Sequence, residues 1–173
     1  MESSRGCGFG HWFQHGGLHT STFRKGVKQV IALDVGTHQL HEKLRRDARV
    51  MSLEQTHVLK VDDVFFKLKK IDFPFALLVM DVSFISSTKV IRHAYGWLAK
   101  GGYWVILVKP QFELEPKKLV RGIVKKPEYR IEALESVIKL ANELGCFKVV
   151  GHIESPITGT DGNVEYLLCL KKE

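Results

Sequence analysis

Short apolar segments of strand length alternate with helical patterns along this chain from residue 30 onward. Such alternation is typical of an α/β protein with a mostly parallel, doubly wound sheet, because each helix carries the chain back to start the next parallel strand. The last two apolar segments follow each other without a helix, which predicts an antiparallel final strand. The predicted strands are 30–35, 49–53, 76–80, 103–108, 147–153 and 165–170, and the predicted helices are 37–46, 61–70, 84–98 and 127–144.

The size of the chain and its longest apolar runs exclude several classes of protein. With 173 residues, of which 45% are hydrophobic and 26% charged, the chain can bury a core without disulfides or a metal. This excludes a disordered chain and a fibrous repeat. The longest apolar runs, 73–80 and 103–108, have the length of a strand and not the roughly 18 residues of a spanning helix. We expect one domain, or one domain with an appendage, and no membrane span.

Cysteine and histidine spacing gives no metal site. Three cysteines lack metal-type spacing and cannot all pair, which indicates a reduced protein of the cytoplasm: Cys7, Cys146 and Cys169. His11, His15 and His19 would share one face of a helix, but Gly16 and Gly17 disfavour a helix there. The first 14 residues also lack the basic start and apolar core of a signal peptide. We therefore predict no metal and a cytoplasmic location.

The chain is basic, with a formal net charge of +7 and a pI near 9.3. This charge suggests an anionic partner, nucleic acid first and an anionic membrane surface second, with an ordinarily basic surface as the alternative. Five cations form a ten-residue stretch without an acid, the basic segment: Lys117, Lys118, Arg121, Lys125 and Lys126. They can contact RNA phosphates, with Phe112 nearby for base stacking, or form a solvated loop, and both interpretations stay open.

Charged side chains stand at the ends of predicted strands, where ligands bind in sheets of this kind. Asp34 ends the first strand, Asp81 follows the third and Lys109 follows the fourth. Asp34 can accept hydrogen bonds from a nucleoside ribose or cap the helix predicted at residue 37. Lys109 near the carboxylate of Asp81 can act as a base, with Glu165 holding it in place. The alternatives are a structural ion pair and, for Glu165, an exposed turn.

Five strings, taken in order, carry a resemblance to a known family. They are ALDVGTHQLHEKLRRDARV (32–50), MDVSFIS (80–86), LVKPQFE (107–113), RGIVKKP (121–127) and SPITGTDGNVEYLL (155–168). Together they resemble the haemolysin A / TlyA family of FtsJ-like ribosomal RNA methyltransferases, over roughly residues 15–170. The resemblance implies a Rossmann-like fold that uses S-adenosylmethionine. It also implies methyl transfer to a ribose 2′-hydroxyl of ribosomal RNA, on cytidine, with ribosomal RNA or a ribosomal subunit as the partner.

The resemblance also implies roles for individual residues. Asp81, Lys109 and Glu165 match the last three members of the family's Lys-Asp-Lys-Glu tetrad. Lys109 would accept or orient the hydroxyl proton, and the two carboxylates would position it, without a metal. The basic segment would contact RNA. The resemblance assigns cofactor binding to these residues: Gly16, Gly17, Asp34, Val35, Gln55, His57 and Asp81.

The chain departs from the family's pattern before residue 30. His15–Thr20 reads HGGLHT where the family has TGGFTD, and the strand that ends Asp-x-Gly-Ser-Ser before this loop has no counterpart. The first lysine of the tetrad and the family's small N-terminal RNA-binding domain are also unmatched. We therefore expect a divergent segment over 1–14, a methyltransferase-like domain over 15–173, and a missing or degenerate first, central strand. Cofactor binding would then be weak or lost.

Three functions from different classes follow from these observations. The first is an S-adenosylmethionine-dependent RNA 2′-O-methyltransferase, active or impaired, and the retained Asp81, Lys109 and Glu165 favour it. The second is a non-catalytic RNA-binding protein that keeps the fold, favoured by the unmatched lysine and cofactor loop. The third is a membrane-active protein, as the word haemolysin suggests, which lacks a spanning segment or a long basic amphipathic helix in this sequence. The pattern alone leaves open whether the chain is an enzyme.

Overall fold

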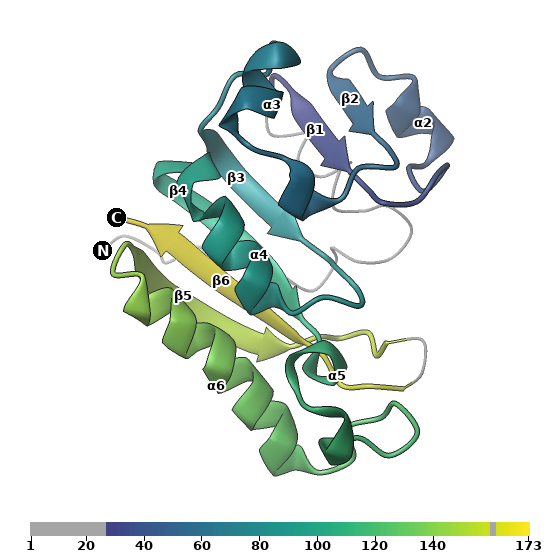
Figure 1. The fold of residues 1–173 in the computed structure, drawn as a ribbon, viewed down its shortest axis with the longest axis vertical. Helices are drawn as coiled ribbons and strands as arrows, with labels where there is room; N and C mark the ends of the chain where they lie inside the picture. Colours follow the sequence, from purple (N-terminus) through teal and green to yellow (C-terminus); the bar gives the residue numbers. More distant parts are fainter. Residues whose placement is uncertain (1–26, 160–161) are drawn as a thin grey trace, which may run out of the picture. The chain divides into compact units, whose positions relative to one another are not determined.

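The computed structural model of the chain describes residues 27–159 and 162–173 (Figure 1). These residues belong to two compact units, Met1–Asp62 and Asp63–Glu173. The expected boundary between residues 14 and 15 lies outside the described residues. The first, central strand that we expect to be missing or degenerate lies there too.

The first unit contains a pair of short parallel strands. β1 (Val30–Leu33) pairs with β2 (Val50–Leu53) in register along their whole length. The chain between them carries α2 (Glu42–Arg45), and η2 (Val58–Lys60) follows β2. Two parallel strands joined through a helical connection form the unit that the alternating sequence pattern predicts.

The first helix is shorter than the sequence pattern predicts. The expected helix over residues 37–46 is wrong for residues 37–41, because α2 begins only at Glu42. His38 has a φ of +56°, which a right-handed helix does not accommodate. The ring of His41 then caps the helix, since its Nδ1 accepts a hydrogen bond of 3.2 Å from the backbone N–H of Lys43.

The second unit is built on a four-stranded sheet. Its strands lie in the order β3 (Phe75–Met80), β4 (Leu98–Val108), β6 (Tyr166–Lys172) and β5 (Phe147–Glu154). β3 and β4 are parallel, whereas β6 is antiparallel to both β4 and β5. Three strands therefore run in one direction and β6 in the other. This confirms the prediction of mostly parallel strands with an antiparallel last strand.

Helices α4 (Ser87–Ala94) and α6 (Pro127–Glu143) pack on one face of this sheet (Figure 1). α3 (Asp63–Leu68) precedes β3, and η3 (Tyr95–Trp97) continues from α4. None of the helices within the described ranges is long and apolar enough to cross a membrane. The core between helices and sheet is mainly apolar, with these side chains buried: Val90, Ile91, Trp104, Ile106, Leu134, Val137, Leu140, Leu168 and Leu170.

The helix expected over residues 84–98 is also wrong at both ends. α4 begins at Ser87, because Phe84 has a φ of +62° and the hydroxyl of Ser86 accepts a hydrogen bond of 3.2 Å from the backbone N–H of Thr88. At the other end the chain passes through η3 into β4, whose first residue is Leu98. The late start of α4 frees residues 81–86 to form a loop at the carboxyl end of β3. The equivalent loop at the end of β4 begins at Lys109.

Candidate active site

Lys109 and Asp81 meet at the carboxyl ends of two neighbouring parallel strands. β3 and β4 are paired up to Met80 opposite Ile106, so the residues that follow lie side by side. The Nζ atom of Lys109 lies 2.7 Å from Oδ1 of Asp81. It also donates a hydrogen bond of 3.0 Å to the hydroxyl of Ser83. The Lys109 side chain is only 15% exposed, whereas that of Asp81 is 50% exposed, so one amine is held by two oxygen acceptors at the edge of the solvent.

Glu165 lies directly before β6 and is buried, with 6% of its surface exposed. Its Oε1 accepts a hydrogen bond of 3.1 Å from Nε2 of Gln111. Burial raises the pKa of this carboxyl above its ordinary value, and the Gln111 hydrogen bond and the charge of Lys109 oppose the rise. The charge of Asp81 adds to it. The expectation of an exposed turn at Glu165 is therefore wrong, and the three side chains act electrostatically on one another.

The loop before β6 is shaped around the Glu165 carboxyl. A Cβ at Gly159 would lie 2.7 Å from Oε1 of Glu165, so a larger residue would displace the carboxyl. In the same loop Asn163 is 1% exposed. Its Oδ1 accepts a hydrogen bond of 2.9 Å from the backbone N–H of Val124, and its Nδ2 donates one of 3.0 Å to the carbonyl of Gly122. The buried amide thus ties the basic segment to the loop that carries Glu165.

An aromatic pair stands on the same two loops, with Phe84 exposed and Phe112 half-buried. Phe84, three residues after Asp81, is 92% exposed and has a φ in the left-handed region. Its ring centroid lies 5.1 Å from that of Phe112, which belongs to α5 (Pro110–Glu113), directly after Lys109. A large apolar side chain held outward on a strained backbone marks a contact surface.

Asp34 lies at the carboxyl end of β1 in the first unit and is exposed. Its Oδ1 accepts a hydrogen bond of 2.7 Å from the backbone N–H of Gly36. The loop is tied to the end of β2 by the N–H of Thr56, which donates to the carbonyl of Asp34 at 2.9 Å. The helix-capping role for Asp34 is wrong, because α2 begins at Glu42. Its Oδ2 has no hydrogen-bond partner in the described part of the chain and can accept one from a ligand.

The neighbours of Asp34 suit a nucleoside. Val35 is 65% exposed, so an apolar surface lies beside the carboxylate. Gln55 is exposed and has a φ of +52°. The ring of His57 caps η2, since its Nδ1 accepts a hydrogen bond of 3.2 Å from the N–H of Leu59. Val35 can pack against a base and Asp34 can accept from ribose hydroxyls, so these residues fit the nucleoside part of the expected cofactor.

Two cations of the basic segment are already paired with carboxylates. Lys117, in η4 (Pro116–Lys118), lies 2.5 Å from Glu115. Lys118 forms a hydrogen-bonded ion pair with Glu132 of α6, and this hydrogen bond raises the pKa of Lys118. Lys118 therefore ties the segment to α6, whereas Lys117 is 75% exposed and its pair with Glu115 is local.

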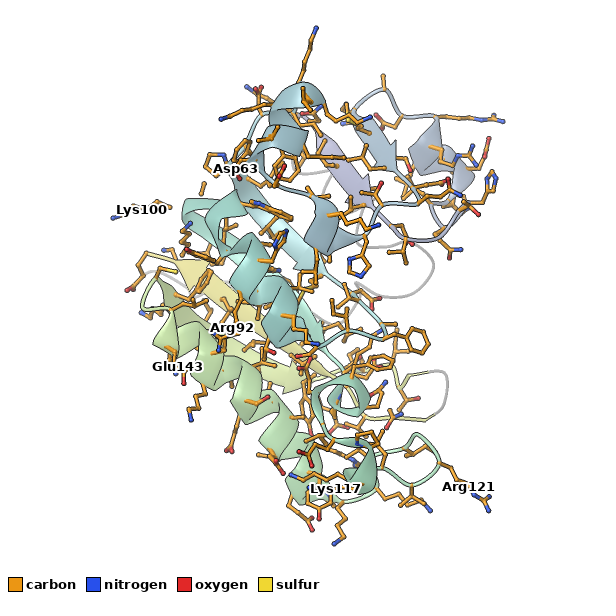
Figure 2. The ribbon with its side chains drawn as sticks, viewed as in Figure 1. Asp63, Arg92, Lys100, Lys117, Arg121 and Glu143 are labelled. Atoms are coloured by element: carbon orange, nitrogen blue, oxygen red, sulfur yellow. The ribbon has the colours of Figure 1, made fainter. Side chains whose placement is uncertain are left out.

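The other three cations, Arg121, Lys125 and Lys126, are exposed and form no ion pair within the described residues. Arg121 stands in a tight turn between Val120 and Ile123, with a φ of +52°. Its side chain projects away from the ribbon (Figure 2). These three residues form the part of the basic segment that is available to phosphates.

Sequence reasoning missed two contacts of the site, Ser83 and Gln111. Each lies two residues after a predicted site residue, Asp81 or Lys109, in the strings 80–86 and 107–113. Position beside a strand end is therefore the one signal that could have found them. Gly16 and Gly17 lie outside the described residues. Within the described residues, no cluster of histidine, cysteine or acidic side chains could hold a metal.

A sheet of mostly parallel strands with helices packed on it defines a Rossmann-like α/β protein, and the lysine and carboxylates lie at its carboxyl edge, where such folds bind their ligands. Residues 6–172 match the family model of the FtsJ-like methyltransferases, and the chain belongs to that family.

Curated relatives and a solved structure agree with this family. The chain is 39% identical over 153 residues to Hemolysin A of Brachyspira hyodysenteriae, covering 88% of this chain and 62% of that protein. It is 36% identical over 159 residues to the 16S/23S rRNA (cytidine-2′-O)-methyltransferase TlyA of Mycobacterium tuberculosis, covering 91% of this chain and 57% of that one. A hemolysin-type protein of Lactococcus lactis has a similar structure, with a TM-score of 0.81 at 38% identity, covering 91% of this chain and 74% of that chain. The chain thus spans about three fifths of the length of these two curated relatives.

Proposed function

We propose that this chain transfers the methyl group of S-adenosylmethionine to a ribose 2′-hydroxyl of ribosomal RNA, on cytidine. The observation that carries the proposal is the Lys109 amine, held by Asp81 and Ser83 next to the buried Glu165. The name of the TlyA relative supports the substrate, since it describes a methyltransferase of the cytidine ribose in 16S and 23S rRNA. Ribosomal RNA or a ribosomal subunit is then the partner, and the cytoplasm is the compartment.

The chemistry assigns one task to each side chain. A ribose hydroxyl is a poor nucleophile, so its oxygen must lose its proton as the new C–O bond forms. Lys109 orients the hydroxyl or, when neutral, takes that proton, and the carboxylate of Asp81 stabilises the ammonium that results. The hydroxyl of Ser83 fixes the position of Nζ, and Glu165 balances the charge of the lysine. Bound S-adenosylmethionine supplies an already activated sulfonium methyl group, so most of the catalysis is positioning.

We further propose that the cofactor binds weakly. Asp34 and Val35 fit its nucleoside part, but the loop His15–Thr20 departs from the family's TGGFTD pattern. Restoring that pattern with His15→Thr, Leu18→Phe, His19→Thr and Thr20→Asp should tighten S-adenosylmethionine binding about tenfold, measured by calorimetric titration. Asp34→Ala should weaken it and serves as the opposite control. The proposal of weak binding would be contradicted if the unaltered chain bound S-adenosylmethionine tightly and the restored pattern left that affinity unchanged.

The exposed cations predict how RNA affinity depends on salt. Replacing Arg121, Lys125 and Lys126 with alanine should reduce the slope of log affinity against log salt by about 2 to 3, since each phosphate contact contributes about 0.7–0.9. Filter binding with an rRNA fragment over a salt series measures the slope. The matched control removes three exposed cations from elsewhere in the unit: Lys89, Lys139 and Lys148. If both triple variants showed the same slope of log affinity against log salt, the basic segment would be a solvated loop without a special role in RNA binding.

The aromatic pair predicts base stacking close to the reacting ribose. Phe84→Ala should lower kcat/KM for rRNA about 5- to 150-fold, because stacking one base on an aromatic ring contributes about 1–3 kcal/mol. Phe84→Trp, which keeps a stacking surface, should stay close to the unaltered chain. Tyr95→Ala removes another exposed ring, one that lies in η3, and is the control. A loss that Phe84→Trp also shows would indicate a backbone role for Phe84.

Methyl transfer from labelled S-adenosylmethionine to rRNA separates this proposal from a non-catalytic RNA-binding protein. The proposal expects 2′-O-methylcytidine in the digested product. RNA binding without any transfer, at saturating cofactor, would favour the RNA-binding protein instead. The variant that assigns the reaction to this site is Lys109→Ala.

A further inference from the structure

Glu113 lies at the end of α5 and reaches across to the loop that follows β3. Its Oε2 accepts a hydrogen bond of 2.5 Å from the hydroxyl of Ser86. Its Oε1 accepts one of 2.7 Å from the backbone N–H of Ser87. Ser86 is the N-cap of α4, and Ser87 is 2% exposed. One carboxylate therefore uses both of its oxygens to hold the start of a helix that comes from another strand.

These two bonds close a bridge between the loops that carry the lysine and its partners. Glu113 lies four residues after Lys109, and Ser86 lies five residues after Asp81. Lys109 joins the near ends of the two loops through Asp81 and Ser83. Glu113 joins their far ends through the first residues of α4. The loop over residues 81–86 is thus fixed at both ends against the loop that begins at Lys109.

The loop between these two attachments needs such support. It contains Phe84 at a φ of +62°, a conformation that a bulky residue keeps only when its surroundings impose it. Phe84 itself is 92% exposed, so its ring gains little burial that would hold the loop. The attachments at Ser83 and Ser86 flank it directly. Without the Glu113 bonds, the loop would keep only its contacts with Lys109 and the contact between the Phe84 and Phe112 rings, so Asp81 and Ser83 would be held less firmly.

We propose that Glu113 is a positioning residue for methyl transfer, one that acts through the 81–86 loop on the Asp81–Lys109 pair and touches neither substrate nor cofactor. This rests on the proposed function of the site. It predicts a loss in the rate of the bound complex rather than in binding. It also predicts that a side chain able to keep both hydrogen bonds restores that rate.

The kinetic test compares Glu113→Ala with Glu113→Gln. In Glu113→Ala, kcat for rRNA methylation should fall at least about tenfold while KM for RNA and for S-adenosylmethionine stays within about twofold. In Glu113→Gln the amide oxygen accepts from Ser87 and the amide N–H₂ donates to Ser86, so kcat should return to within about threefold. Glu135→Ala, which removes an exposed carboxylate from α6, is the matched control. An unchanged kcat in Glu113→Ala would overturn the inference.

Amide hydrogen exchange tests the bridge without any assay of the reaction. Exchange at residues 82–88 should be faster in Glu113→Ala than in the unaltered chain and in Glu113→Gln, whatever the chemistry of the site proves to be. Unchanged exchange there would overturn the inference. If the unaltered chain transfers no methyl group but exchange changes as expected, the proposed function fails and the bridge stands. If Glu113→Ala does not fold, Ser86→Ala removes one of the two bonds and should show a smaller change in both measurements.

Discussion

Methyl transfer to rRNA should fall by about 10²–10⁴-fold when Lys109 is replaced by alanine, while RNA affinity stays within about twofold. The range is the usual contribution of a positioned general base. Lys109 is only 15% exposed and paired with Asp81, so it offers little charge to an RNA phosphate. Single-turnover transfer of labelled methyl groups at saturating cofactor measures the rate, and filter binding measures the affinity.

The matched control for this prediction is Lys100→Ala. Lys100 is an exposed lysine of the same strand, β4, and lies near the end of that strand opposite to the site (Figure 2). The same loss of one positive charge there should leave both measurements unchanged. Normal methylation by Lys109→Ala would show that another group takes the proton. Equal RNA binding without transfer by the unaltered chain would instead support the non-catalytic RNA-binding function.

Strand ends were the most predictable part of the site. Asp81 and Lys109 each follow a run of apolar residues, and parallel neighbours must end at the same edge of the sheet. Their side chains therefore meet, as their 2.7 Å contact confirms. Glu165 was proposed from its place at the start of the last strand and matched to the tetrad through the resemblance to the family, and its sequence context also suited an exposed turn. Its burial depends on Gly159 and Gln111, which are six and 54 residues away in the chain.

The start of α4 was less predictable than that of α6, which begins at Pro127 as expected, because a long-range contact supports it. The apolar pattern from residue 84 onward is compatible with a helix that begins there. The observed start at Ser87 depends on the carboxylate of Glu113, which reaches it from the next strand's loop. For the same reason, composition did not show which cations of the basic segment are paired with carboxylates. Lys118 forms an ion pair with Glu132 of α6, whereas the side chain of Arg121 projects outward (Figure 2).

Replacing Glu165 with glutamine should have opposite effects on activity and on stability. The raised pKa of Glu165, caused chiefly by burial, means that the folded chain holds a proton there more tightly than the unfolded chain does. Its stabilising form is therefore the neutral one. Stability should fall as pH rises from the carboxyl's ordinary value through the raised pKa, and the cost persists at neutral pH. Glutamine removes this cost, and its amide oxygen still accepts the hydrogen bond from Gln111.

The expected result at pH 7 is a higher melting temperature for Glu165→Gln, together with a methyl-transfer rate at least about tenfold lower. The rate falls because the variant no longer offers Lys109 a negative charge. Thermal melts of both proteins between pH 4 and pH 8 check the first effect, since the difference between them should vanish at acidic pH. Glu154→Gln changes an exposed carboxyl at the end of β5 and should show neither effect. A Glu165→Gln chain that melts lower at pH 7 would show that the buried charge is stabilised by Lys109 more than burial disfavours it.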